Sequence, residues 1–269
     1  MSSRRLIFAS FAVRIVWRTR FIVGEAVLAL AICCLVATTL HGGLRENDFS
    51  SNLAPDTVRA FVTATFVPWS LVGTAVALGL GASVIPVELQ RGRSLMVLAG
   101  PMARSEFLLQ CWASIVLVIT MHFGVGILAG AIAVKLALGI TPSTLFWAGA
   151  LQTLSGAMLV ASIALALSVR YSPFLAGSIA IAVLTIPTWL FELHDHSSTW
   201  IRIMVRAIAI VTPAARHAGA TADGLVRSPT SQGGLAALVV VGDDLCYSAL
   251  VLWLAAAVFK NADIGLRRS

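Results

Sequence analysis

Charged residues are scarce in this sequence. Only 12% of its 269 residues are Asp, Glu, Lys or Arg, whereas 58% are apolar, and the mean hydropathy is +0.92. A typical soluble domain is about one quarter charged. Because one water-facing globule cannot bury so much apolar surface, the composition excludes a soluble enzyme. It predicts an all-α, polytopic membrane protein with a single transmembrane domain over residues 1–269.

Recognisable catalytic machinery is also lacking. The sequence has no Gly-x-x-x-x-Gly-Lys-Ser/Thr loop for ATP phosphates, and Ser83 lies in GASV without the second glycine of a nucleophile elbow. His194 and His196 form a His-x-His pair, but no further metal ligand is identifiable, and a solvated loop is the simpler interpretation. We therefore expect no enzymatic activity, no directly bound cofactor and no metal site.

Cysteine is infrequent and its spacing indicates neither zinc nor a disulfide framework. All four cysteines fall in apolar runs, where we expect small buried side chains. They are Cys33, Cys34, Cys111 and Cys246.

Acidic residues are expected only near the ends of membrane spans. Glu25 lies about one turn into the first span, where Arg18 or Arg20 is close enough to form an interfacial ion pair. Asp243 and Asp244 are expected at the outer mouth of the last span. A proton-coupled transporter usually needs a deep acid, so this distribution disfavours secondary transport.

Long apolar runs are abundant, and a helix needs about 20 apolar residues to cross a bilayer. Six runs reach this length, and we predict a transmembrane helix in each. They are residues 21–40, 59–87, 107–134, 145–169, 174–191 and 239–259.

The excess of basic residues predicts how these spans are oriented. Lys and Arg number 19 against 12 acidic residues, giving a net charge of +7 and a pI of about 10.1. With both termini in the cytoplasm, the short inner segments hold twelve of the basic residues and the outer segments hold seven. The positive-inside rule therefore favours a multi-pass protein of the inner (plasma) membrane with cytoplasmic termini, and the basic charge needs no nucleic-acid partner.

Three segments outside the spans also show helical patterns. Residues 1–20 alternate arginines with apolar residues and predict an amphipathic helix on the inner membrane surface. The outer loop between spans five and six predicts a helix near residues 200–211. The inner loop at residues 88–106 has polar edges and an apolar centre, which predicts a short helix between spans two and three that either lies on the membrane or docks a cytoplasmic partner.

This inner loop resembles the signature of type-2 ATP-binding-cassette (ABC) exporter permeases. In the signature, an acid and a glycine precede a leucine-rich short helix, a proline, an arginine and a second acid. The matching residues here are Glu88, Gly92, Leu95 to Leu98, Pro101, Arg104 and Glu106. Arg93 replaces the threonine of the signature, and Cys111 replaces its closing lysine. The C-terminal residues Phe259, Lys260, Asp263 and Ile264 are similar to the end of these permeases.

The resemblance implies a dimer of permeases, formed with a second copy or a paralogous chain. Each permease docks a cytosolic ABC ATPase subunit that binds ATP and Mg²⁺. The short helix between spans two and three would be the coupling helix, and residues 260–269 a cytoplasmic tail. The residues expected to couple to the ATPase are Glu88, Arg91, Gly92, Leu95, Leu98, Pro101, Arg104 and Glu106. In the alternative interpretation, the arginines only anchor the loop to anionic lipid.

The apolar spans indicate an amphipathic or hydrophobic cargo, such as a drug, a lipid or a peptide, moved by multidrug or lipid efflux. Phe66, Trp69 and Trp189 are possible pathway residues, although aromatic residues in spans more often pack against neighbouring helices. A permease for lipid-linked polysaccharide and a non-transport membrane anchor or sensor remain as alternatives.

Overall fold

The described part of the chain, in a computed structural model, comprises residues 55–90, 103–138, 144–193 and 231–261. It is entirely helical and contains no strand over these ranges. The helices are α3 (Pro55–Gln90), α5 (Arg104–Leu138), α6 (Thr144–Ser168), α7 (Pro173–Leu193) and α10 (Ser231–Asn261). They match the second to sixth predicted spans, which confirms the all-helical class. The first predicted span, the amphipathic helix at residues 1–20, the short coupling helix and the outer-loop helix lie outside the described residues.

Four of these helices are long and apolar enough to cross a bilayer. The candidate spans are Trp69–Val87, Arg104–Ile132, Phe146–Ser168 and Leu238–Lys260. The described apolar stretch of α7, Pro173–Val183, is shorter. Each long helix satisfies its own backbone hydrogen bonds, as spanning segments must in hydrocarbon. The chain is thus a multispan helical membrane protein, and the count of six spans stays a prediction.

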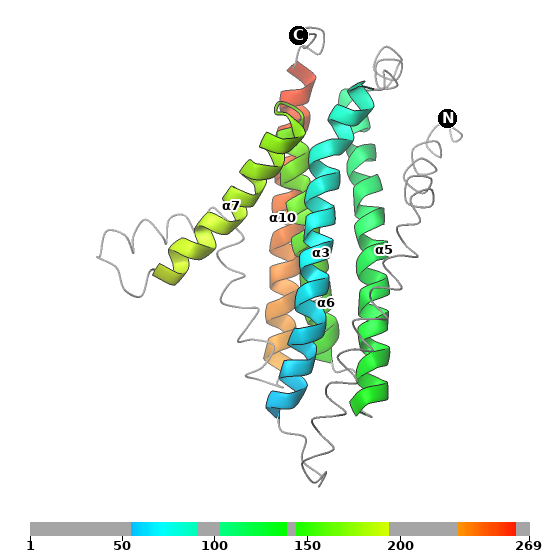
Figure 1. The fold of residues 1–269 in the computed structure, drawn as a ribbon. Coiled ribbons are helices and arrows are strands. Elements are labelled where there is room, and N and C mark those ends of the chain that lie inside the picture. The colour runs from blue at the N-terminus through cyan, green and yellow to red at the C-terminus, as the bar shows by residue number, and fades with distance from the viewer. Residues whose placement is uncertain (1–54, 91–102, 139–143, 194–230, 262–269) are drawn as a thin grey trace.

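Helices α3, α5, α6 and α10 stand side by side, and α7 diverges from them (Figure 1). The ends of α3 and α10, the start of α5 and the turn from α6 to α7 all lie at one end of the bundle (Figure 1). These ends adjoin the segments that the charge pattern predicts to be cytoplasmic.

Helix α6 is the centre of the bundle because it contacts each of the other four described helices. In its apolar stretch, Phe146–Ser168, 56% of the residues are buried, against 33% or less in the other candidate spans. Small residues such as Ala161 and Ala164 allow this close approach, as is common between membrane helices. A Cβ atom added to Gly81 of α3 would lie only 2.7 Å from the Ala161 carbonyl oxygen.

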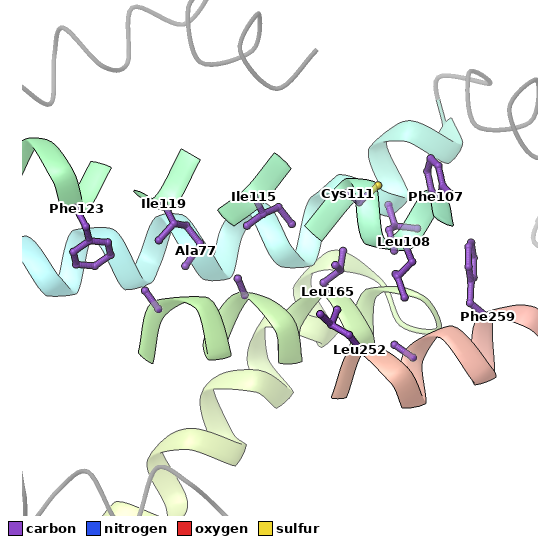
Figure 2. Packing of buried hydrophobic residues seen from close by; sticks show 14 of the residues in the cluster. Ala77, Phe107, Leu108, Cys111, Ile115, Ile119, Phe123, Leu165, Leu252 and Phe259 are labelled. Carbon is purple, nitrogen blue, oxygen red and sulfur yellow. The ribbon is translucent and has the colours of Figure 1, made fainter. Parts of the chain in front are cut away.

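The main apolar core runs along the face that α5 turns toward α3, α6 and α10 (Figure 2). Phe107, Ile115, Ile119 and Phe123 follow one another along α5, each no more than 2% exposed. Because successive members are four or eight residues apart, they form one stripe on the helix. On the surfaces that face away from this core, large apolar side chains are exposed, as expected where lipid surrounds a helix. Leu128 of α5 is 59% exposed and Trp253 of α10 is 67% exposed.

Candidate functional site

The residues predicted to couple to an ATPase are described only in part. Glu88 lies in the last turn of α3, and Arg104 and Glu106 lie in the first turn of α5. The side chain of Glu106 is exposed. The remaining predicted coupling residues lie outside the described residues. These are Arg91, Gly92, Leu95, Leu98 and Pro101.

Arg104 joins the start of α5 to the end of α10. Its Nη1 atom donates hydrogen bonds of 3.3 Å to the carbonyl oxygens of Phe259 and Lys260. Carbonyl groups in the last turn of a helix have no partner within the helix, and the helix dipole makes this end favourable for a cation. Arg104 therefore caps α10 from a position 155 residues away in sequence.

Apolar packing adds to this contact between the start of α5 and the end of α10, which we call the α5–α10 joint. The rings of Phe107 and Phe259 face each other with centroids 6.3 Å apart, and both side chains are 1% exposed. Figure 2 shows the two rings at the end of the core nearest this contact, with Leu108 close to Phe107. The Arg104 hydrogen bonds and the aromatic contact together make the first turn of α5 and the last turn of α10 one packed unit.

Trp69 is the one predicted pathway residue whose side chain is described. It is 5% exposed and stacks on His122 of α5, with ring centroids 4.4 Å apart and an angle of 2° between the planes. The ring of Phe123 is nearly perpendicular to that of His122, with the two centroids 5.3 Å apart. Trp69 thus packs between α3 and α5. Phe66 and Trp189 belong to α3 and α7, and a role for any of the three in a pathway stays a prediction.

Asp244 is buried in the bundle, which the sequence did not predict. Asp244 lies six residues, about 9 Å, into the candidate span Leu238–Lys260, so its place near the start of the last span agrees with the expectation. Its side chain is fully buried, and its Oδ2 atom accepts a hydrogen bond of 2.6 Å from the Ser155 hydroxyl of α6. Asp244 is therefore a carboxyl group buried between two helices, near the start of the candidate span.

Two further buried polar side chains accompany this pair. Gln152 precedes Ser155 by one turn of α6, and its main-chain carbonyl also accepts a hydrogen bond of 2.9 Å from the Ser155 hydroxyl. Ser248 follows Asp244 by one turn of α10. The Gln152 amide nitrogen and the Ser248 hydroxyl are buried and have no hydrogen-bond partner within the described helices. We call these four residues the α6–α10 polar group.

Sequence reasoning missed this group because Gln152, Ser155 and Ser248 are uncharged polar residues within long apolar runs. The available signal was the spacing. Gln152 and Ser155 are three residues apart, and Asp244 and Ser248 are four apart, so each pair lies on one face of its helix.

The cysteines divide between two environments. Cys111 is buried in the core, as expected. Cys246 is exposed, which corrects the expectation that it is buried, because α10 turns that face away from α6. Cys33 and Cys34 lie outside the described residues, as do His194 and His196. Among the residues that are described, no three His, Cys, Asp or Glu side chains come together as metal ligands.

Neither a protein-family model nor a curated protein matches this sequence. The class that the fold defines is a multispan helical membrane protein. It has a packed joint at one end of its bundle and a buried carboxyl group between two of its helices.

Proposed function

We propose that the chain is the transmembrane subunit of an ATP-driven exporter of the ABC class. The observation that carries this proposal is the string from Glu88 to Glu106, which resembles the coupling signature of these permeases and connects two long apolar helices, α3 and α5. The subunit would itself perform no bond chemistry. Two such permeases would enclose a pathway, and each would dock a cytosolic ATPase that carries ATP and Mg²⁺.

The joint between α5 and α10 suggests how a displacement of the inner loop would be transmitted to the transmembrane helices. The expected coupling helix runs from about Glu88 to Leu98, and α5 begins six residues later at Arg104. Because Arg104 and Phe107 hold the last turn of α10, a displacement of the loop by the ATPase would move α5 and α10 together. A packed interface of this kind changes between discrete arrangements, which is what alternation between inward- and outward-facing states requires.

The proposed cargo is an amphipathic or hydrophobic molecule taken from the cytoplasm or the inner leaflet. Helix α6, at the centre of the described bundle, contains no charged residue. A pathway between such helices favours apolar molecules over strongly hydrated ones, because burying polar groups without partners costs free energy.

The first test is the isolation of the tagged chain from native membranes in mild detergent. We expect a P-loop ATPase without membrane spans to copurify in stoichiometric amount, and mass spectrometry identifies it. Reproducible absence of such an ATPase would contradict the exporter proposal and favour a non-transport anchor or sensor.

A second test reverses the charge of Arg91. If this residue contacts the ATPase, Arg91→Glu should lower export and ATPase copurification at least about tenfold, because an unpaired charge at an interface costs 1.4 kcal/mol or more. Membrane insertion, followed by fractionation, should remain normal. Arg91 is preferable to Arg104 for this purpose, since changing Arg104 also removes the cap of α10.

The matched control is Arg170→Glu, which reverses an exposed basic residue in the turn between α6 and α7 at the same end of the bundle. If the arginines only bind anionic lipid, both variants should affect insertion or orientation similarly. Normal export and ATPase copurification in Arg91→Glu would exclude its docking role.

A further inference from the structure

One face of α3 is left uncovered by the other described helices. Ala75 and Gly79 are exposed on it, and Ser83 is partly exposed. Because these residues are four apart in sequence, they lie on one side of the helix. Other sides of α3 are covered, since the helix packs against α5, α6 and α7. We call Ala75, Gly79 and Ser83 the open face of α3.

The residues of the open face differ from those on the surfaces that suit lipid. Over the described part of α3, the exposed large apolar side chains are Leu71 and Val72, and both precede this face. Helix α10, in contrast, exposes leucine, valine and tryptophan side chains from Leu238 to Val258. Small and hydroxyl-bearing residues are enriched where membrane helices contact one another. The open face of α3 therefore fits a neighbouring helix better than it fits lipid chains.

The chain itself supplies a helix for this position. Residues 21–40, the predicted first span, lie outside the described residues and are connected to the start of α3 at Pro55 by residues 41–54. Two spans joined by one loop run in opposite directions through the membrane, and consecutive elements usually neighbour each other in space. The first span is thus the segment of the chain best placed to reach α3.

Polar residues of the two segments also match in depth. Ser83 lies four residues before Val87, where the candidate span of α3 ends, and Glu25 lies four residues after Phe21, where the predicted first span starts. At a rise of about 1.5 Å per residue, each lies about 6 Å from the predicted inner boundary of the membrane. An acidic side chain within a span generally pairs with another protein group. The hydroxyl of Ser83, which donates a hydrogen bond of 2.6 Å to the Gly79 carbonyl, is the polar group of the open face at this depth.

We propose that the predicted first span packs antiparallel against the open face of α3, with Glu25 beside Ser83. Rotation of the Ser83 side chain to another staggered position turns its hydroxyl from the Gly79 carbonyl toward the carboxylate. The carboxylate keeps enough acceptor positions for the ion pair expected with Arg18 or Arg20. A separation of about 8–10 Å between the helix axes leaves room for a side chain at Gly79, where an added Cβ atom meets nothing within 4 Å. The contact lies within one chain, so it does not depend on the proposed exporter function.

Disulfide formation between Cys33 and Ala75→Cys tests this contact. Cys33 lies twelve residues after Phe21 and Ala75 twelve residues before Val87, so the same register places them at one depth. The other three native cysteines are changed to alanine, and a protease site is inserted within residues 41–54. After oxidation with copper phenanthroline in native membranes and cleavage, a disulfide holds the two fragments together on a non-reducing gel. Because a disulfide needs Cα atoms within about 7 Å, we expect most chains to remain joined.

The matched control is Thr74→Cys, which adjoins Ala75 in depth but lies on another side of α3 and is also partly exposed. Its yield of joined fragments should be at least about tenfold lower. A second pair, Glu25→Cys with Ser83→Cys in a chain without native cysteines, should also be joined, and it decides the result if Ala75→Cys is not inserted. Separate fragments in both pairs would overturn the proposal and leave the open face to lipid. Disulfide-linked dimers would overturn it in favour of a second copy of the chain, and equal yields in Ala75→Cys and Thr74→Cys would exclude the proposed face.

Discussion

Replacing Gly81 by valine is expected to force α3 away from α6 and to lower the apparent Tm of the chain by about 3–10 °C. A Cβ atom at this position would lie 2.7 Å from the Ala161 carbonyl oxygen and 2.9 Å from the Ala164 Cβ atom. A backbone oxygen cannot rotate away as a side chain can, so the helices themselves must separate. Overpacking in a well-filled core typically costs 1–3 kcal/mol, which corresponds to this range of Tm for a chain of this size.

Gly79→Val provides the control for this prediction. Gly79 lies on the same helix, and a Cβ atom added there meets nothing within 4 Å. Thermal unfolding of both variants in lipid nanodiscs should leave Gly79→Val close to the wild type. Equal stability of the two variants would contradict the close approach of α3 and α6.

Replacing Gly126 by valine should displace Trp69 from its stack on His122. A Cβ atom at Gly126 would overlap the indole ring of Trp69, and Phe123 contacts the other side of the stack. The indole must leave its buried position between α3 and α5. We expect a loss of about 1–3 kcal/mol, measured as a lower apparent Tm together with a change in tryptophan fluorescence.

A double-mutant cycle separates this clash from a general effect on α5. Trp69→Ala removes the ring and creates space, so the combination with Gly126→Val should be more stable than the sum of the two single changes predicts. Gly124→Val on the same helix, where a Cβ atom meets nothing within 4 Å, should have little effect. Additive losses in the double variant would show that Gly126 does not limit the position of Trp69.

The close helix contacts at these glycines and the hydrogen bond of the α6–α10 polar group contribute differently to the stability of the bundle. Glycine and alanine allow α3 and α6 to approach until their backbones touch, and membrane helices associate through this kind of contact because lipid provides no hydrophobic drive between them. The Ser155–Asp244 hydrogen bond contributes less to stability, since such bonds average about 0.6 kcal/mol in membrane proteins.

The long helices could be predicted from sequence because the bilayer leaves few alternatives. An apolar run of about 20 residues must form a helix to satisfy its backbone, and the runs at residues 59–87, 107–134 and 145–169 correspond to α3, α5 and α6. The last predicted span, residues 239–259, agrees with the candidate span Leu238–Lys260, and α10 extends beyond the start of that span. Its first turns contain Ser, Gln and two glycines, a composition typical of loops, yet these residues continue the helix back to Ser231.

The sequence by itself determined the membrane class, the helical content and the positions of most helices, because these depend on the hydropathy of contiguous residues. Only the tertiary structure decided that Asp244 meets Ser155 and that Arg104 caps α10. Both contacts join residues far apart in sequence, and each depends on the rotation of one helix about its axis relative to another. That rotation is set by side-chain packing between helices, which the hydropathy of either helix alone does not specify.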